Sequence, residues 1–386
     1  MMDKRKPLFC AVAVIVSASM AGPASAAPQA PSITVTPVVS GLNAARGIAF
    51  DGQGSMYVAE SGQAMGGPDG VNRTGQVGKY ADGSFARQWV TPFSSLRGSE
   101  HGPEALGPEG ISAVGNGCMR HSNGQRNGCQ IQMIMSESQA GTGNLDPARQ
   151  LGHLYRLDGA SGVPTDKSDV GGQQYQWTTA HRSLFSDFPD SNPYGLLVTK
   201  GEGGTRTFVA DAGANTISEV GKDGTDHVLA YIPNETTVAH RDATPTCVTE
   251  GPDGALYVGT LDLGSNFGAN GGQSHVYRID PNAGENYLTA AHEWAHGLTS
   301  ISACTFDRAG NFWGTELFGA TTHGAPGDLV RIPFAQPTAI THLGAPGQII
   351  LPGGIAQGPD GAMYVTTHTA DPTLNAGTVV RVSASG

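Results

Sequence analysis

The feature that most constrains this chain is a pattern of short strands that recurs six times. Each copy has an apolar strand, a turn that ends in glycine and a second strand, and a third strand follows. A unit of this kind cannot bury both of its faces alone, so consecutive copies must pack against one another. Alternating apolar and polar residues and Asp-Gly turns predict an all-β fold, a six-bladed β-propeller with four-stranded antiparallel blades. The copies begin at Arg46, Glu109, Tyr194, Thr246, Ser302 and Gly353.

Composition and the position of the last repeat complete this prediction. The chain has 56 glycines and 24 prolines, and only 14% of its residues are charged, as expected for short strands joined by tight turns. The sixth third strand lies close to the C-terminus. We therefore expect ITVTPVVSGL, which starts at Ile33, to supply the missing outer strand of the last blade and close the ring. Residues 33–386 should form one domain.

The N-terminus has the pattern of a secretory signal peptide. Basic residues at 4–6 precede an apolar run that is shorter than the about 20 residues of a membrane span, and Ala-Ser-Ala at 24–26 provides a cleavage site. We expect residues 1–26 to be removed on export, leaving a secreted or periplasmic protein without a membrane span; a buried first helix is the alternative. The net charge of −11 argues against nucleic-acid partners. We expect a monomer.

Four cysteines follow the predicted signal peptide, and an even number in an oxidising compartment favours disulfides. Cys118 and Cys129 bracket a short polar loop, so we predict that they pair. Repeat alignment places Cys247 and Cys304 on the inner strands of consecutive blades, at neighbouring positions that face opposite ways. We predict a second bond, Cys247–Cys304, and the alternative is two free buried thiols.

The end of each second strand and the start of each first strand should meet at one face, around the mouth of the central channel. Connections after the second strand are long in five repeats, which marks this face as the functional one. Several carboxylates facing one channel would repel one another without a cation or a raised pKa. The alternative is that each caps a turn through hydrogen bonds to the backbone. The carboxylates predicted to bind a divalent cation such as calcium are Glu60, Glu137, Asp211 and Glu316.

The ligand-binding residues predicted for the same mouth are Arg46, Glu109, Asn192, Tyr194 and His323. Arg46 would steer an anionic group or pair with a carboxylate. Tyr194 would offer a face on which a ligand stacks, and His323, in a long mouth loop, would act as an acid, a base or a ligand.

One motif is misleading. His292, Glu293 and His296 have the His-Glu-x-x-His spacing of zinc proteases, which requires a helix. Repeat alignment places this segment on an outer strand and the following turn, where its two histidines would lie roughly 13 Å apart. We therefore predict that it is not a protease site.

Two specific segments, DSNPYGLL at 190–197 and ADAGAN at 210–215, resemble the ScyD/ScyE family of exported propellers. The less specific GPDGALYV and GPDGAMYV are shared with the broader NHL and gluconolactonase-like six-bladed propellers. The resemblance implies the fold and export, and it implies no catalytic residues. The chain departs from the family at Gly107-Pro108-Glu109-Gly110, where relatives have Gly-Pro-His-Asp, so no role of that histidine carries over.

Three functional hypotheses follow. The first is a secreted propeller that binds a small-molecule or extracellular ligand at the channel mouth, in an accessory role. The second is a divalent-metal-dependent hydrolase or lyase that acts on lactones or esters, by analogy of fold. The third is a protein-interaction scaffold. The sequence has no G-x-S-x-G elbow, P-loop or dinucleotide fingerprint, which disfavours serine hydrolysis, phosphoryl transfer and dinucleotide chemistry.

Overall fold

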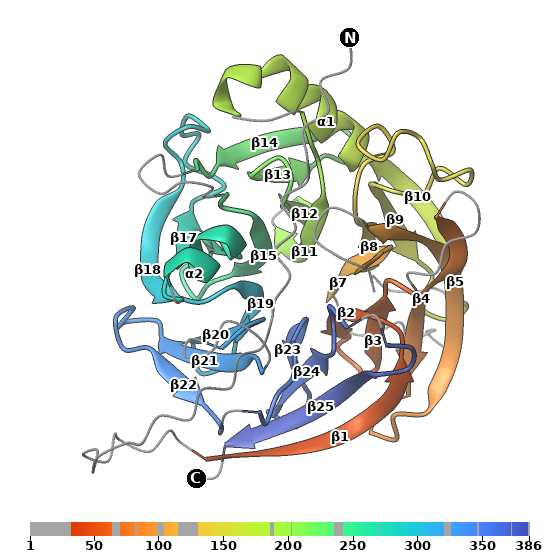
Figure 1. Ribbon diagram of the computed structural model, residues 1–386, viewed down its shortest axis with the longest axis vertical. Helices are drawn as coiled ribbons and strands as arrows, with labels where there is room; N and C mark the ends of the chain where they lie inside the picture. The colour runs from red at the N-terminus through yellow and green to blue at the C-terminus, as the bar shows by residue number, and fades with distance from the viewer. Residues whose placement is uncertain are drawn as a thin grey trace.

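The computed structural model describes residues 32–384, apart from 64–69, 82, 99–103, 115–129, 186–188, 202, 235–241, 270, 320–325, 346 and 372. Within these ranges the strands form six sheets around a central axis (Figure 1). The predicted six-bladed β-propeller of four-stranded antiparallel blades is confirmed, with one extra strand in the first blade. The predicted signal peptide and the predicted Cys118–Cys129 bond lie outside the described residues.

Every blade runs from an inner strand at the channel to an outer strand at the rim. The inner strands are β2 (Ala45–Phe50), β7 (Pro108–Val114), β11 (Pro193–Gly201), β15 (Pro245–Glu250), β19 (Ile301–Phe306) and β23 (Ile355–Gln357). The second strands are β3 (Met56–Glu60), β8 (Gln130–Met135), β12 (Gly204–Asp211), β16 (Leu256–Thr260), β20 (Asn311–Glu316) and β24 (Met363–Thr367). The third strands are β4 (Val71–Tyr80), β9 (His153–Leu157), β13 (Thr216–Val220), β17 (Ser274–Ile279), β21 (Asp328–Pro333) and β25 (Gly377–Ala384). The outer strands are β5 (Arg87–Gly98), β10 (Pro164–Asp169), β14 (Asp226–Tyr231), β18 (His292–Leu298), β22 (Thr341–Leu343) and β1 (Ile33–Leu42). We number the blades 1 to 6 by the order of their inner strands.

The ring is closed by the first strand of the chain. β1 pairs with β25 along the outer edge of blade 6, in the register Ile33↔Ala384 to Leu42↔Gly377 (Figure 1). Each inner strand also contacts the inner strands of both neighbouring blades, β23 and β2 included. The predicted role of the segment from Ile33 is therefore confirmed.

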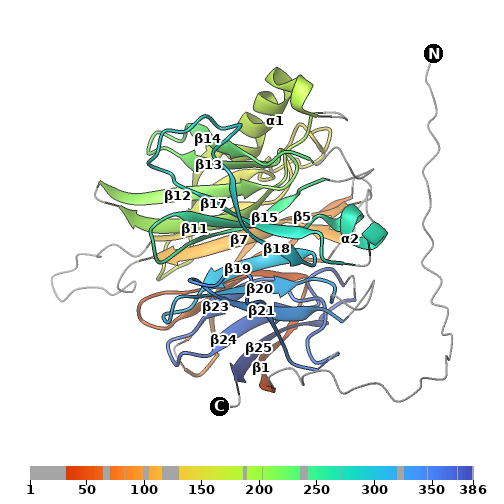
Figure 2. The same ribbon diagram turned by 90° about the vertical axis from the view of Figure 1, so that its left-hand side faces the viewer.

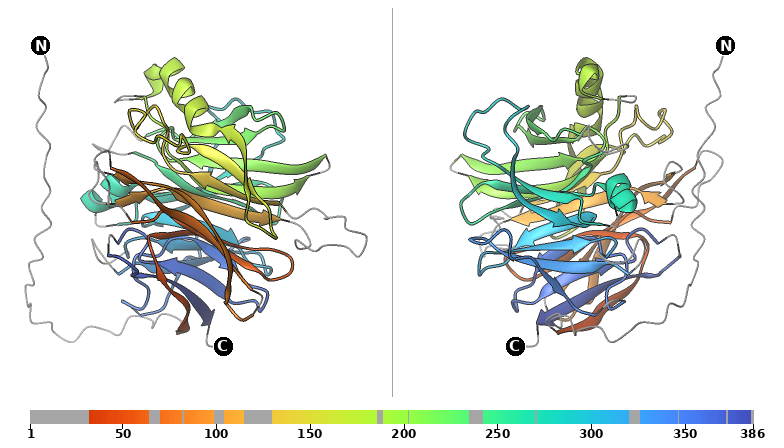
Figure 3. Two further views of the ribbon diagram at one scale, coloured as in Figure 1. Left: turned by 90° about the vertical axis from the view of Figure 1, so that its right-hand side faces the viewer. Right: turned by 60° about the vertical axis from the view of Figure 1, so that its left-hand side comes forward.

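Few elements lie outside the four-stranded plan. The short β6 (Glu104–Leu106) adds a fifth strand to blade 1. Helix α1 (Val170–Ala180) and a 3-10 helix (Arg182–Leu184) lie at the rim, and α2 (Leu263–Ala269) follows β16. Figures 2 and 3 show α2 on one face of the ring and the end of β11, beside the start of β12, on the opposite face. In the described part of the chain, neither helix has the length and apolarity needed to cross a bilayer.

The repeated motif of an acidic residue, a glycine and a later aromatic residue forms the turn between the inner strand and the second strand of a blade. The turns need glycine in the left-handed region, as at Gly254 (φ +76°) and Gly361 (φ +83°). The acidic residue accepts a hydrogen bond from the aromatic side chain at the start of the second strand, which explains why the two recur together. These pairs are Asp51–Tyr57 (2.9 Å), Asp253–Tyr257 (3.3 Å), Asp307–Trp313 (2.8 Å) and Asp360–Tyr364 (3.2 Å).

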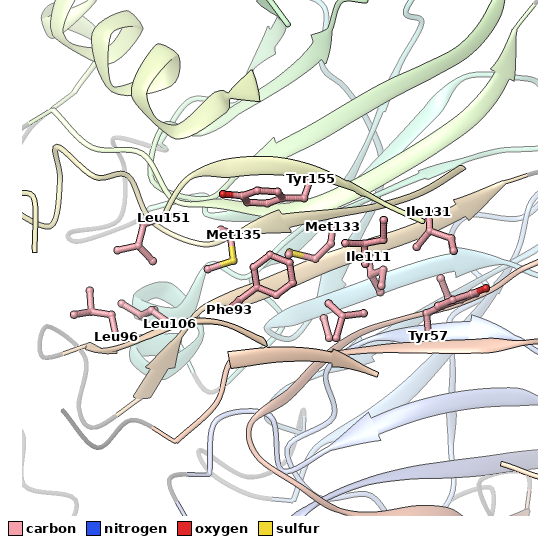
Figure 4. Packing of buried hydrophobic residues seen from close by; sticks show 14 residues of the cluster. Tyr57, Phe93, Leu96, Leu106, Ile111, Ile131, Met133, Met135, Leu151 and Tyr155 are labelled. Carbon is pink, nitrogen blue, oxygen red and sulfur yellow. The ribbon is translucent and has the colours of Figure 1, made fainter. Parts of the chain in front are cut away.

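Hydrophobic burial occurs between blades rather than at the centre of the molecule. Each of the six blade junctions has its own cluster of buried apolar side chains. Figure 4 shows the junction of blades 1 and 2, where Tyr57 and Phe93 face Met133 and Tyr155. Because each blade is covered on both sides only when the ring is complete, closure by β1 contributes to the stability of every blade.

A disulfide joins blades 4 and 5. Cys247 in β15 and Cys304 in β19 have Cα atoms 5.7 Å apart, within the range that a disulfide requires, and the structure bonds their sulfur atoms. Both cysteines belong to the buried cluster at this junction. The bond predicted from repeat alignment is thus present in the structure.

Candidate functional site

A small cavity lies where the six inner strands begin. Its volume is about 80 Å³, and all six residues at which the repeats start line it, together with Thr369 after β24. Three of the five predicted ligand-binding residues, Arg46, Glu109 and Tyr194, are therefore brought together at the channel mouth. Their role in binding stays a prediction.

Irregular strand pairing directs these side chains toward the cavity. In five blades the register between the inner and second strands shifts at the start of the inner strand, and such a bulge changes the direction of the residues within it. The shifts lie at Ala45/Ile48, Pro108/Ile111, Pro193/Gly195, Pro245/Cys247 and Ile301/Ala303. They enclose the residues that line the cavity.

Glycines next to these bulges let the inner strands approach closely. A Cβ atom on Gly47 would lie 2.6 Å from the carbonyl oxygen of Glu109, and one on Gly110 would lie 2.5 Å from that of Tyr194. Larger residues at these positions would push neighbouring blades apart, so the glycines keep the channel narrow.

Hydroxyl groups hold neighbouring blades together at the same level. In four of the six junctions a side-chain hydroxyl donates a hydrogen bond to a backbone carbonyl at or just before the next inner strand. These bonds run from Ser61 to Pro108 (3.0 Å), Thr246 to Ile301, Ser302 to Pro352 (2.7 Å) and Thr366 to Arg46 (2.7 Å). Hydrogen bonds from side chains of one blade to the backbone of the next therefore stabilise the mouth, in addition to hydrophobic packing.

Arg46 and Glu109 form a buried ion pair in the cavity wall. Their side chains are 6% and 2% exposed, and Arg46 Nε lies 3.4 Å from Glu109 Oε1. Arg46 also donates to the hydroxyl of Tyr194 (3.3 Å) and to the carbonyl of Ala105 (3.0 Å), and Ser61 donates to Glu109 (3.1 Å). Of the two roles considered for Arg46, pairing with a carboxylate is the one seen.

The DSNPY and ADAGAN segments meet at Asp211. This fully buried carboxylate accepts hydrogen bonds from the Ser191 hydroxyl (2.6 Å) and the Asn192 backbone (2.7 Å), and from N–H groups of residues 213 and 214. Burial raises the pKa of Asp211 despite these hydrogen bonds. DSNPY and ADAGAN thus form one structural unit, which positions Tyr194 at the mouth.

Asn192, also predicted to bind ligand, connects two blades. Its side-chain oxygen accepts a hydrogen bond from the backbone N–H of Glu137 (3.0 Å), which has a positive φ of 61°. Asn192 is not among the residues that line the cavity. His323, the fifth predicted ligand-binding residue, lies outside the described residues.

Glu60 and Glu316 occupy equivalent positions in blades 1 and 5, and both cap a turn. Each is fully buried and accepts a hydrogen bond from the backbone N–H of a residue before the inner strand, Asn43 for Glu60 (2.9 Å) and Thr299 for Glu316 (2.7 Å). Burial raises the pKa of both carboxyl groups. With Asp211, three of the four predicted metal ligands therefore make the backbone hydrogen bonds of the capping alternative, and their binding of a metal stays a prediction.

The four predicted metal ligands do not come together as one set. In the described ranges, one group of three or more His, Cys, Asp or Glu side chains has ligand atoms within 4.8 Å of one another, and it contains Glu316, Asp328 and His342. The pKa of His342 is raised to about 10, chiefly by its hydrogen bond to Asp328 (3.0 Å) and by the carboxylate of Glu316, 3.4 Å away. Sequence reasoning missed Asp328 and His342 because they lie on strands outside the predicted mouth.

The His-Glu-x-x-His segment forms β18, the outer strand of blade 4, as predicted. Glu293 contacts His275 (2.8 Å) and His296 (2.9 Å), whereas His292 contacts Glu285 (2.9 Å). The two histidines of the motif therefore have different partners, and the segment has no zinc-protease geometry.

Fold and site together define a six-bladed β-propeller with a polar cavity at the mouth of its channel. Neither the protein-family models nor the curated proteins that were searched give a match. Among solved structures, the chain is similar to virginiamycin B lyase from Staphylococcus aureus (TM-score 0.46, 13% identity, 91% of this chain and 99% of that chain). It is also similar to the calcium-binding protein regucalcin from Agrobacterium tumefaciens (TM-score 0.48, 14% identity, 91% and 93% covered). A third neighbour is a gluconolactonase from Xanthomonas campestris (TM-score 0.48, 10% identity, 93% and 96% covered). These neighbours are gluconolactonase-like and NHL-like six-bladed propellers.

Proposed function

We propose that the protein is an exported member of the ScyD/ScyE family that binds a small neutral polar molecule at the channel mouth. The observation that carries this proposal is the cavity lined by the Arg46–Glu109 pair and the Tyr194 hydroxyl. A concave site with a few convergent polar groups is the usual form of a small-molecule site.

The charges favour a neutral ligand. Because Glu109 lies 3.4 Å from the guanidinium of Arg46, the pair carries no net charge toward the cavity. Thr246 donates its hydroxyl proton to a backbone carbonyl, which leaves oxygen lone pairs as acceptors, whereas Ser302 hydrogen-bonds both to a carbonyl and to the Thr315 hydroxyl (2.9 Å). The buried Thr369 hydroxyl has no hydrogen-bond partner among the described residues. A ligand with hydroxyl or amide groups would satisfy these atoms.

The size of the cavity limits what enters it. A volume of about 80 Å³ is well below the roughly 300–1,000 Å³ of sites that enclose a drug-sized molecule. One polar group of the ligand would therefore occupy the cavity while the rest lies on the surrounding loops. Phe267 and Leu374, 45% and 43% exposed, follow second strands and offer apolar contacts there.

Binding is tested by thermal melts and calorimetry with a panel of monosaccharides, polyols and sugar lactones. Tyr194→Phe removes one hydroxyl from the cavity and should weaken binding about three- to tenfold, the value of one neutral hydrogen bond. Tyr364→Phe is the matched control, because its hydroxyl bonds to Asp360 in a turn of blade 6. Binding that is equally strong in both variants, or no binding by any member of the panel, would refute the proposal.

The same panel tests the rival function. Hydrolysis of a lactone that stops when a chelator is added would support the metal-dependent hydrolase or lyase and displace simple binding. Export is tested separately by the mass of the protein recovered from the medium or periplasm, which should begin at Ala27. A full-length mass with Met1 would contradict cleavage.

A further inference from the structure

The outer part of blade 5 contains a second polar site, distinct from the channel. Glu316 ends β20, Asp328 begins β21 and His342 lies in β22, so three neighbouring strands each contribute one side chain. His342 Nδ1 lies 3.0 Å from Asp328 Oδ2 and 3.4 Å from Glu316 Oε2.

Blade 1 has a carboxylate at the position equivalent to Glu316, and there the neighbouring side chains neutralise it. The equivalent carboxylate, Glu60, lies opposite Gln76 on the third strand, and Gln76 donates a hydrogen bond to it (2.7 Å). Arg87 adds a positive charge 3.5 Å away. In blade 5 the residue opposite Glu316 is Asp328, a second carboxylate. Like charges placed opposite each other on neighbouring strands are destabilising, so the two carboxylates need positive charge beside them, which the His342 imidazolium or a bound metal ion can supply.

One atom of the cluster is buried without a hydrogen bond. Glu316 is fully buried, and its Oε1 accepts the Thr299 N–H. Its Oε2 lies at ion-pair distance from His342 Nδ1 (3.4 Å) but has no hydrogen-bond partner among the described residues. A buried carboxylate oxygen in this state costs free energy that a bound ion would offset.

We propose that Glu316, Asp328 and His342 bind one zinc ion. Zinc takes nitrogen and carboxylate ligands at about 2.0–2.2 Å in a tetrahedral arrangement, which separates neighbouring ligand atoms by about 3.3 Å. The separations of 3.0 and 3.4 Å from His342 Nδ1 are close to that value. Calcium prefers six to eight oxygen ligands, so an imidazole with two carboxylates suits zinc better.

The ion has access from solvent and leaves a coordination position open. His342 and Asp328 are 38% and 24% exposed, whereas Glu316 forms the buried floor of the site. Zinc takes the place of the proton on Nδ1, which is released to water. A water molecule would complete the tetrahedron on the exposed side.

The proposal is tested on the whole protein by calorimetry after removal of metal with a chelator. Titration with zinc chloride should show one zinc per chain, and calcium chloride should bind far more weakly. Cobalt chloride should produce a visible absorption band typical of tetrahedral coordination by this metal.

Two variants locate the site. His342→Gln and Asp328→Asn should each weaken zinc binding by at least about tenfold and abolish the cobalt band. His296→Gln is the matched control, since that exposed imidazole lies beside Glu293 in the outer strand of blade 4. His342 is itself partly exposed, so His342→Gln should fold even if Asp328→Asn does not.

Three results would overturn the proposal. They are the absence of stoichiometric zinc binding, undiminished binding in His342→Gln, and loss of binding in His296→Gln instead. Any of them would leave the blade 5 cluster as an ion-pair network that supports the Thr299 turn. Because neither variant touches the channel, the outcome is independent of ligand binding at the mouth.

Discussion

Arg46 and Glu109 place opposite charges in a region from which water is largely excluded. Removing one partner of a buried pair leaves an uncompensated charge and costs about 3–5 kcal/mol, whereas replacing both by apolar residues costs much less. We therefore expect Arg46→Leu to lower the free energy of unfolding by about that amount. The double variant Arg46→Leu, Glu109→Leu should recover most of the loss, as measured by urea denaturation. A double variant as unstable as the sum of the two single variants would show that the charges are not coupled.

Asp226 in β14 makes stability depend on pH in the opposite direction from a carboxylate whose pKa is lowered by folding. Burial raises the pKa of Asp226 from 3.8 to about 6, and Gln174 of α1 donates a hydrogen bond to it. The folded state therefore holds this proton more tightly than the unfolded state. The free energy of unfolding should fall as pH rises from about 4 to about 6 and then become level, with a total loss on the order of 2–3 kcal/mol.

Asp226→Asn should remove this dependence and stabilise the protein at pH 7. Asp223, in the turn before β14, is a matched control of opposite sign. Hydrogen bonds from Thr225 lower the pKa of Asp223, so Asp223→Asn should reduce stability at neutral pH instead. Chemical denaturation at pH 4, 6 and 7 measures both. A wild-type curve that rises between pH 4 and 6 in proportion to Asp226 ionisation would contradict the argument.

Between elements, the Cys247–Cys304 bond joins the inner strands of blades 4 and 5. It closes a loop with a sequence separation of 57 residues, for which the loss of chain entropy in the unfolded state corresponds to about 4 kcal/mol. Cys247→Ala, Cys304→Ala should lower the melting temperature under oxidising conditions. Peptide mapping without reduction should recover the linked Cys247 and Cys304 peptides. Two free thiols at these positions would instead support the alternative of unpaired buried cysteines.

The Asp-Gly turn and the DSNPY and ADAGAN segments all have structural roles in this protein. The Asp-Gly turn with its aromatic partner shapes the first hairpin of a blade, as in Asp360 with Tyr364. The DSNPY and ADAGAN segments meet at Asp211. Sequence similarity in these segments therefore reports the fold.

For the whole molecule, β1 determines whether the ring is closed. Deleting residues 33–42 exposes the long edge of β25 and uncovers the cluster at the junction of blades 5 and 6, which includes Ile33. We expect a broad, less cooperative melt and a loss of several kcal/mol, larger than for most single substitutions. A synthetic peptide of residues 32–42 added to the truncated chain should restore stability, and a scrambled peptide should not. Unchanged melting after the deletion would show that the ring is stable without β1.

The sequence by itself determined the number of blades, the order of their strands, the closing strand and the ring of residues at the mouth. These features follow from the periodicity of apolar residues and from turns such as the one at Gly254. Both are patterns of residues that are close together in the sequence, so they can be recognised without a structure. The extra strand β6 could not be predicted, because three residues carry too little periodic signal.

Only the tertiary structure decided which polar groups meet. The ends of the second strands could be located from sequence, but whether Glu60, Asp211 and Glu316 face a shared ion or cap turns depends on the direction of each side chain within its blade. The pairing of Arg46 with Glu109 depends on how closely two blades approach. The Glu316, Asp328 and His342 cluster depends on register across three strands, which links residues that no local pattern connects.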